Sequence, residues 1–305
     1  MAFQIHNDSI QASVKKVAIE QIDKAIADVR NNNLDIHEKV HNSRVRCKNI
    51  RGLLRLIRTS IRPSYQAENI FFRDCARLLS DIRDSQSMIE IFDKIMTQFK
   101  HQINPKDFNH IHKHLLDHQS KIIQNNEGIK SSLNAFLKQM LYAHSRVDEW
   151  KIEGSGFHCI KDGLKKTYAD GKKAMNNAYS HHHSSRDNFH EWRKSTKYHS
   201  HHLKLLRPLW IKPMEARLSE VENLSSLLGD EHDLTIFSNL LHNLSEELKN
   251  NELEVLIDLI YRQKTHLHEK ARVLGLNVYA ESPKHFSRRI STYWSNWEKF
   301  NRKNN

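Results

Sequence analysis

The 305-residue sequence contains only eight glycines and five prolines. A chain so poor in turn-forming residues is not typical of a sheet protein, and the scarcity favours long helices. The three cysteines (Cys47, Cys75 and Cys159) are an odd number, and no two have the short spacing of a zinc knuckle or a redox pair. We therefore expect plain thiols in a reducing compartment.

The sequence also lacks long apolar runs and a signal sequence. No segment approaches the roughly 18 apolar residues of a membrane-spanning helix, and the N-terminal MAFQIHNDSI has no basic-then-apolar pattern. These absences predict a cytoplasmic protein without membrane insertion.

Positive charge, in contrast, is abundant. Lys and Arg number 48 against 36 Asp and Glu, which gives a net charge of +12 at pH 7, and 22 His are expected to add charge as the pH falls. An excess of this size predicts a polyanionic partner, namely nucleic acid, an anionic membrane or a phosphate polymer.

Apolar residues recur at helical spacing along most of the chain, and no segment has the alternation of a convincing strand. The prolines fall where helices are expected to begin or end. The expected helices cover roughly residues 9–30, 37–61, 65–82, 84–101, 105–124, 127–147, 160–180, 187–207, 212–228, 231–249, 251–274 and 283–301.

The sequence repeats itself at an offset of 149 positions. Most matched residues are charged, so a chance match between apolar heptads does not explain them. We predict two helical repeat units, 1–150 and 151–305, that together form one all-α domain. The matched pairs include His41 and His190, Arg44 and Arg193, Lys48 and Lys197, Arg58 and Arg207, Asp81 and Asp230, and Asp84 and Asp233.

The first repeat carries a basic stripe on the helix expected at 37–61. Because successive helical residues are about 100° apart, the stripe occupies an arc roughly 100° wide and runs about 25 Å along the axis. Between Arg44 and Arg58 no acidic residue relieves the repulsion, which indicates that an anion binds there. The stripe consists of His41, Arg44, Lys48, Arg51, Arg55 and Arg58.

The second repeat has its own stripe, weakened where Ser200 stands opposite Arg51 of the first. A third basic block, GLKKTYADGKKAM, spans residues 163–175, and its tyrosine hydroxyl could donate to a phosphate oxygen. The second stripe consists of His190, Arg193, Lys197, His201, Lys204 and Arg207, and the third block contributes Lys165, Lys166, Tyr168, Lys172 and Lys173.

These segments resemble the CHAD family, the conserved histidine α-helical domain. HNSRVRCKNIRGLLRLIR (41–58) is similar to its signature, FHEWRKSTK (189–197) to the second-half counterpart, and LLSDIRD (78–84) and LLGDEHD (227–233) to its L-G-D-x-x-D elements. The GLKKTYADGKKAM segment is similar to the opening of the family's second half. Asn49, Ser80 and Ser200 depart from the family's usual residues.

The resemblance implies two pseudo-symmetric four-helix bundles around a basic central groove or pore. It also implies non-catalytic binding of inorganic polyphosphate, with association with polyphosphate granules, and no cofactor or metal. The ligand contacts implied by motif position are His41, Arg44, Lys48, Arg51, Arg55, Arg58, Lys165, Lys166, Tyr168, Lys172, Lys173, His190, Arg193, Lys194, Lys197, Lys204 and Arg207.

Two other functions stay open at this point. The same charge could bind nucleic acid or other polyanions, although the stripes lack the interleaved aromatic residues that stack on bases. Paired acids could support a metal-dependent polyphosphate hydrolase. We expect these acids (Asp81, Asp84, Asp230 and Asp233) to cap helices or to pair with basic residues, and we expect most histidines, apart from His41 and His190, to lie on the surface.

Overall fold

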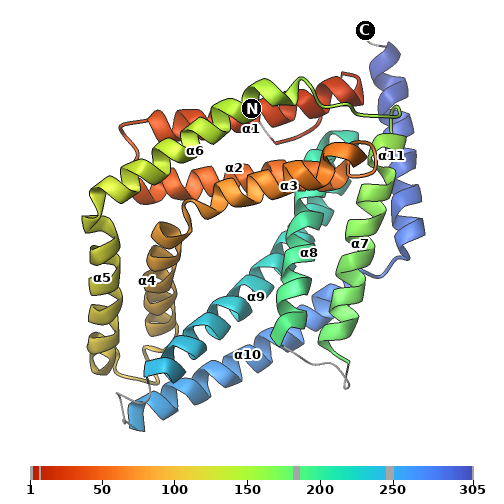
Figure 1. The fold of residues 1–305 in the computed structure, drawn as a ribbon. Coiled ribbons are helices and arrows are strands. Elements are labelled where there is room, and N and C mark those ends of the chain that lie inside the picture. The colour runs from red at the N-terminus through yellow and green to blue at the C-terminus, as the bar shows by residue number, and fades with distance from the viewer. Residues whose placement is uncertain (1–2, 7, 181–185, 245–250, 304–305) are drawn as a thin grey trace.

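A computed structural model describes residues 3–6, 8–180, 186–244 and 251–303, in which all regular secondary structure is helical (Figure 1). None of the described helices combines the length and apolar character needed to cross a lipid bilayer. The helices are α1 (Ile10–Arg30), α2 (Ile36–Leu56), α3 (Arg62–Arg77), α4 (Ser80–Phe99), α5 (Asn109–Gln124), α6 (Asn126–Val147), α7 (His158–Ala178), α8 (Arg186–Leu205), α9 (Ile211–Leu244), α10 (Asn251–Val278) and α11 (Pro283–Lys303), with short 3₁₀ helices η1 (Pro105–Phe108) and η2 (Arg207–Leu209).

The all-α prediction is confirmed, but several predicted helix boundaries are wrong. The helix expected at 37–61 ends at Leu56, so Arg58 lies in the turn that follows, and the helix expected at 65–82 is α3, Arg62–Arg77. The helices expected at 212–228 and 231–249 are not separated: residues 211–244 form the single helix α9, which continues through Gly229 and Asp230. A glycine inside a helix costs about 0.5–1 kcal/mol relative to alanine but does not end the helix. A Cβ added at Gly229 would meet nothing within 4 Å, so no close packing requires a glycine there.

A capping box fixes the start of α2, the helix that carries the first basic stripe. The Asp35 carboxylate accepts from the backbone N–H of Glu38 at 2.8 Å, and the Glu38 carboxylate accepts from the backbone N–H of Asp35 at 3.0 Å. These two bonds satisfy amides that the first helical turn leaves without partners. The helix therefore begins at a defined residue, which sets the direction of each basic side chain after it.

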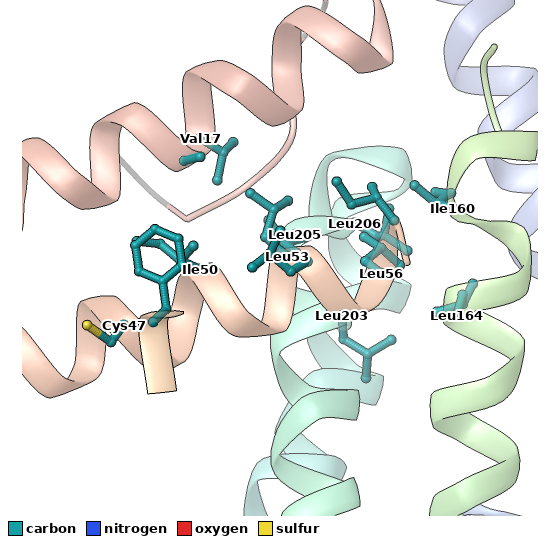
Figure 2. Packing of buried hydrophobic residues seen from close by; sticks show 14 of the residues in the cluster. Val17, Cys47, Ile50, Leu53, Leu56, Ile160, Leu164, Leu203, Leu205 and Leu206 are labelled. Atoms are coloured by element: carbon teal, nitrogen blue, oxygen red, sulfur yellow. The ribbon is translucent and has the colours of Figure 1, made fainter. Parts of the chain in front are cut away.

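The main hydrophobic core joins the two halves of the chain. Leucines from α2 (Leu53 and Leu56) pack with Leu203 of α8, with Leu206 directly after α8, and with Leu164 of α7, as Figure 2 shows. Helices α1, α3, α6 and α11 contribute to the same buried cluster. The pseudo-two-fold relation between two bundles stays a prediction, whereas the shared core shows that the halves fold against each other.

Two glycines allow the helices of the two halves to approach closely. A Cβ on Gly52 would lie 2.6 Å from Nδ1 of His201, and His201 is the residue that matches Gly52 at the repeat offset. The crossing of α2 and α8 therefore falls at equivalent positions of the two repeats. Gly163 of α7 meets the end of α2, where a Cβ would lie 1.9 Å from the carbonyl oxygen of Leu56.

A second hydrophobic core lies at the far end of α9. It joins the α4–α5 hairpin to the C-terminal part of α9 and to α10, through residues such as Phe92, Phe237 and Ile260. In Figure 1, α4 and α5 extend from the α1–α2–α3–α6 layer toward this junction. The two cores thus hold α2, α4, α8 and α9 around a common space, and that space contains the candidate site.

Candidate anion-binding groove

A groove of about 720 Å³ lies where α2, α4, α8 and α9 meet. Six of its lining residues are Lys or Arg and three are Asp or Glu, so the lining carries excess positive charge. Both repeats contribute to it. The lining residues are His41, Arg44, Val45, Lys48, Arg83, Asp84, Ser87, Met88, Glu90, Ile91, Lys94, Arg193, Lys197, His232, Asp233 and Ile236.

Arg44 is held in place by the start of α4. Its guanidinium donates to the Ala76 carbonyl at 3.0 Å and to the Ser80 hydroxyl at 2.8 Å, and it lies 3.8 Å from a carboxylate oxygen of Asp84. Ser80 is one of the positions that depart from the family pattern, and here its hydroxyl orients the arginine. A fixed guanidinium loses less side-chain entropy when it binds a phosphate.

Two lysines from different repeats bring unpaired charge to the groove. Burial by the surrounding protein, together with repulsion from Arg44 and Arg193, lowers the pKa of Lys48 to about 8. Burial and the charges of Arg193 and Lys48 lower the pKa of Lys197 to about 8 as well. A lowered lysine pKa means that the free protein disfavours the charged form. An anion bound among these residues would remove that penalty.

The acidic lining residues are partly neutralised by arginines. Arg83 makes a two-pronged bond to Glu90, at 2.9 and 2.8 Å, while Asp84 faces Arg44. Burial raises the pKa of Asp233 despite the nearby cations Lys94 and Arg193. Asp230 pairs with Lys94 at 2.5 Å. The expectation of helix caps is wrong for Asp230 and Asp233, which lie inside α9, while pairing with bases is confirmed for Asp84 and Asp230.

Three groove residues of basic type, Arg83, Lys94 and His232, were not predicted from the sequence. Arg83, Ser87, Glu90 and Lys94 follow one another at intervals of four, three and four, which is the spacing of one helical face. This spacing can be read from the sequence. Because the face carries both positive and negative charges, however, it resembles an ordinary solvated helix face.

A second pocket, of about 370 Å³, lies between α2, α7 and α8. Its lining includes Arg55, Lys173 and Lys194, which are three of the predicted contacts, together with Tyr198. The Arg55 guanidinium stacks over the Tyr198 ring at 4.0 Å from its centroid. Asp170 and Glu191 also line this pocket, and Glu191 forms a close ion pair with Lys194, so its charge is more balanced than that of the groove.

Arg51 and Arg58 lie outside both pockets and bind the protein. Arg51 donates through Nε to the Asn69 side chain at 3.2 Å, and Arg58 donates to the Thr167 hydroxyl at 3.0 Å. Neither arginine has a carboxylate within ion-pair distance among the described residues. Their charge along α2 therefore stays uncompensated.

Several other predicted contacts are paired with acids or lie elsewhere. Lys204 pairs with Glu222 at 2.6 Å, Arg207 with Glu215 at 3.4 Å, and Lys166 with Asp170 at 3.2 Å. Lys165 points into a different pocket between α7 and α11. None of these four residues lines the central groove.

The predicted role of Tyr168 is wrong, because its side chain is fully buried in the core. Its hydroxyl donates to the carbonyl oxygens of Val278 and Glu281, at 3.2 and 3.3 Å, and is not free for a phosphate. Lys172 donates to the Glu281 carbonyl at 3.0 Å and secures the same turn after α10. Both residues join α7 to the C-terminal helices.

The described histidines include groove residues, buried residues and exposed residues such as His110 and His114, which lie on the surface as expected. His41 lines the groove with a pKa lowered by burial, and the His190 ring lies beside that of His232, with centroids 5.2 Å apart and planes tilted by 46°. The expectation of surface histidines is wrong for His199 and His202, which are fully buried. The three consecutive histidines at 181–183 lie outside the described residues. Within the described part of the chain, no three potential metal ligands (His, Cys, Asp or Glu) come together as a metal site.

Burial keeps several of these histidines neutral near neutral pH. It lowers the pKa of His202 to about 3 and that of His232 to about 4, so neither adds charge at mildly acidic pH. His202 is tied to the helix crossing, with Nε2 3.1 Å from the Gly52 carbonyl oxygen. His202 therefore serves packing, His232 lines the groove as a neutral side chain, and the positive potential of the groove comes from Arg and Lys.

A family model, described as the CHAD domain, matches residues 16–242. The chain belongs to the CHAD domain family. Two solved structures share the fold. The first is the CHAD domain from the plant Ricinus communis, with a TM-score of 0.64, 16% identity, and coverage of 92% of this chain and 96% of that one. The second is PptA from Streptomyces chartreusis, with a TM-score of 0.61, 9% identity, and coverage of 90% and 100%.

No curated protein matches this CHAD chain. At such low identities, the solved structures establish the fold alone. The function of this CHAD protein must therefore be argued from its own groove.

Proposed function

We propose that this CHAD protein binds inorganic polyphosphate without catalysis, through the basic helix faces of both repeat units. One observation carries the proposal. Arg44 and Lys48 of the first repeat line the same groove as Arg193 and Lys197, the residues that match them in the second. A linear polymer with a charge at nearly every phosphate suits cations contributed from two sides.

The side chains suit a phosphate chain better than a nucleic acid. Arginine grips phosphate oxygens with a two-pronged geometry, and lysine acts as a movable point charge. The groove lining contains no Phe, Tyr or Trp on which a base could stack. The second pocket, with Arg55 and Lys173, would offer cations to a chain that extends beyond the groove.

Two of the three carboxylates in the groove, Asp84 and Glu90, have a non-catalytic explanation. Asp84 and Glu90 face Arg44 and Arg83, and such pairing limits the repulsion among the basic residues while no ligand is bound. A hydrolase would need carboxylates free to bind metal or to move protons. The proposed partner also implies a cytoplasmic location, including granules where polyphosphate accumulates.

Titration calorimetry with long-chain polyphosphate at two salt concentrations tests the proposal, with duplex DNA as a parallel ligand. We expect saturable binding that weakens steeply with salt because bound counterions are released. DNA should bind more weakly. Phosphate release is measured in the same samples with Mg²⁺ or Mn²⁺, and none is expected. Equal binding of DNA would replace the proposal with general polyanion binding, and metal-dependent phosphate release would replace it with hydrolysis.

A further inference from the structure

A separate pocket of about 340 Å³ lies between α7 and α11, and none of its residues lines the central groove. It includes Lys165, which the sequence analysis assigned to polyphosphate, but its other basic residues were not singled out. The lining residues are Phe157, Lys161, Lys165, Lys284, Ser287, Arg288 and Ser291.

The charge of this pocket is of one sign. Lys161 and Lys165 lie four residues apart on α7, and Lys284 and Arg288 lie four residues apart on α11, so each helix places two like charges on one face. The lining contains no acidic residue. No carboxylate among the described residues lies within ion-pair distance of these four side chains, whereas Glu90 and Asp84 relieve the central groove.

A buried hydroxyl supplies a second, independent sign of a ligand. Ser287 is only 3% exposed, and its Oγ has no hydrogen-bond partner among the described residues. A helical serine commonly satisfies its hydroxyl on the carbonyl four residues earlier, as Ser295 does with Ser291 at 3.0 Å. Leaving a buried donor without a partner is unfavourable, so an acceptor in the pocket would bind there.

We infer that this pocket is a second, independent anion site that takes a short run of linked phosphates, two or three groups long. Four cations surround such a ligand, the Ser287 hydroxyl donates to one of its oxygens, and Phe157 closes one side. The volume is less than half of the groove's 720 Å³, which suits a compact anion better than a long chain. The α11 residues also lie beyond residue 242, where the family match ends.

Lysine footprinting can test this site on the full chain. The protein is treated briefly with acetic anhydride, with and without tripolyphosphate, and acetylation is quantified by mass spectrometry at each lysine. We expect tripolyphosphate to slow acetylation of Lys161, Lys165 and Lys284 at least threefold. The double variant Lys284→Gln with Arg288→Gln, whose side chains are exposed on α11, should lose more than half of that protection at Lys161 and Lys165.

A second variant separates this site from the groove. Lys48→Glu with Lys197→Glu should leave the protection of Lys161 and Lys165 intact, even if polyphosphate binding in the groove is lost. Long-chain polyphosphate is tested in parallel. If it protects these lysines in the groove variant, the pocket accepts chain ends, and if only tripolyphosphate protects them, the pocket takes free short oligophosphates.

Three results would overturn the inference. They are no protection in the wild-type protein, protection that disappears with the groove variant, and equal protection of Lys130 and Lys138. The last two lysines lie exposed on α6 and report non-specific screening. Circular dichroism of both variants confirms that the helices are intact.

Discussion

The stripes on α2 and α8 have the same spacing but different surroundings. Near the N-terminal ends of the two stripes, Arg44 and Lys48 meet Arg193 and Lys197 in one groove. Beyond the crossing at Gly52 and His201 the stripes differ. Arg55 of α2 and Arg58 in the turn after α2 have no acidic partner among the described residues, whereas Lys204 of α8 and Arg207 of η2 pair with Glu222 and Glu215.

This difference shows that a repeated motif does not imply a repeated site. Sequence spacing gives the direction of a side chain from its own helix, but neighbouring helices decide whether its charge is already neutralised. The α9 acids cancel the end of the α8 stripe, and the corresponding part of α2 meets a tyrosine and a threonine. We therefore expect anion binding to follow α2 along its length and α8 only near the crossing.

The largest effect should come from reversing the two groove lysines. Each charge-assisted hydrogen bond contributes about 1.5–3 kcal/mol, so Lys48→Glu with Lys197→Glu should lower polyphosphate affinity at least about 100-fold, as measured by calorimetry. Thermal stability should not fall, because the two new carboxylates lie among arginines.

The matched control lies at the C-terminal end of the second stripe. Lys204→Gln with Arg207→Gln removes two predicted contacts that are already paired with acids, and it should change the affinity by less than about threefold. A similar loss in both double variants would mean that the whole α8 stripe binds the ligand, and the contrast between the stripes would be lost.

An intermediate effect is expected from the far end of α2. Arg55→Gln with Arg58→Gln removes two cations without acidic partners, and affinity for long-chain polyphosphate should fall roughly tenfold. Tripolyphosphate, which is too short to leave the groove, should bind this variant as it binds the wild type. If the variant binds the long chain as tightly as the wild type does, the ligand stops at the crossing.

The smallest effect is a pH dependence carried by the groove lysines. A bound polyanion raises the pKa of Lys48 and Lys197 above their free values of about 8, so proton uptake accompanies binding. Affinity should therefore fall as the pH rises from 7 to 9. The fall should be only roughly fivefold because Lys48, although surrounded by the groove walls, keeps solvent-accessible surface where water screens its charge. The variant Lys48→Gln with Lys197→Gln should lose most of this slope, and an unchanged slope would show that other groups titrate.

Stability of the free protein should respond to the same lysines in the opposite direction. Their folded pKa of about 8 lies below the ordinary lysine value of 10.5, so the unfolded chain binds more protons between these pH values. The contribution of these lysines to the free energy of unfolding therefore rises with pH across that window. Thermal melts of the wild type and the Gln variant separate this contribution from other titrations.

Much of the fold could be predicted because the local signals were strong. Prolines and polar gaps mark most helix ends, and the expected 9–30 became Ile10–Arg30. The failure at α9 has a physical reason. The LLGDEHD pattern resembled a junction, but Leu228 and Leu234 pack into different cores on one continuous helix. A glycine weakens a helix by less than this packing stabilises it.

The groove was only partly predictable. The stripe on α2 follows from helical periodicity, yet Arg83 and Lys94 are recognised only after α4 is packed opposite α2. Tyr168 was predicted to contact the ligand but does not. Its position in a basic segment gave no sign that its ring packs with Phe286 and Tyr279 in the core. Periodicity identifies faces of helices, and tertiary packing decides which of them meets solvent.

The length of α9 has a mechanical consequence. This helix has 34 residues and so spans about 50 Å at 1.5 Å per residue. One end is anchored in the main core by Val221 and Leu224, and the other in the second core by Phe237 and Leu241. Between these anchors, α9 contributes His232 and Asp233 to the lining of the groove. Because both ends of α9 are held in a core, its side of the groove is fixed at two points before a ligand binds.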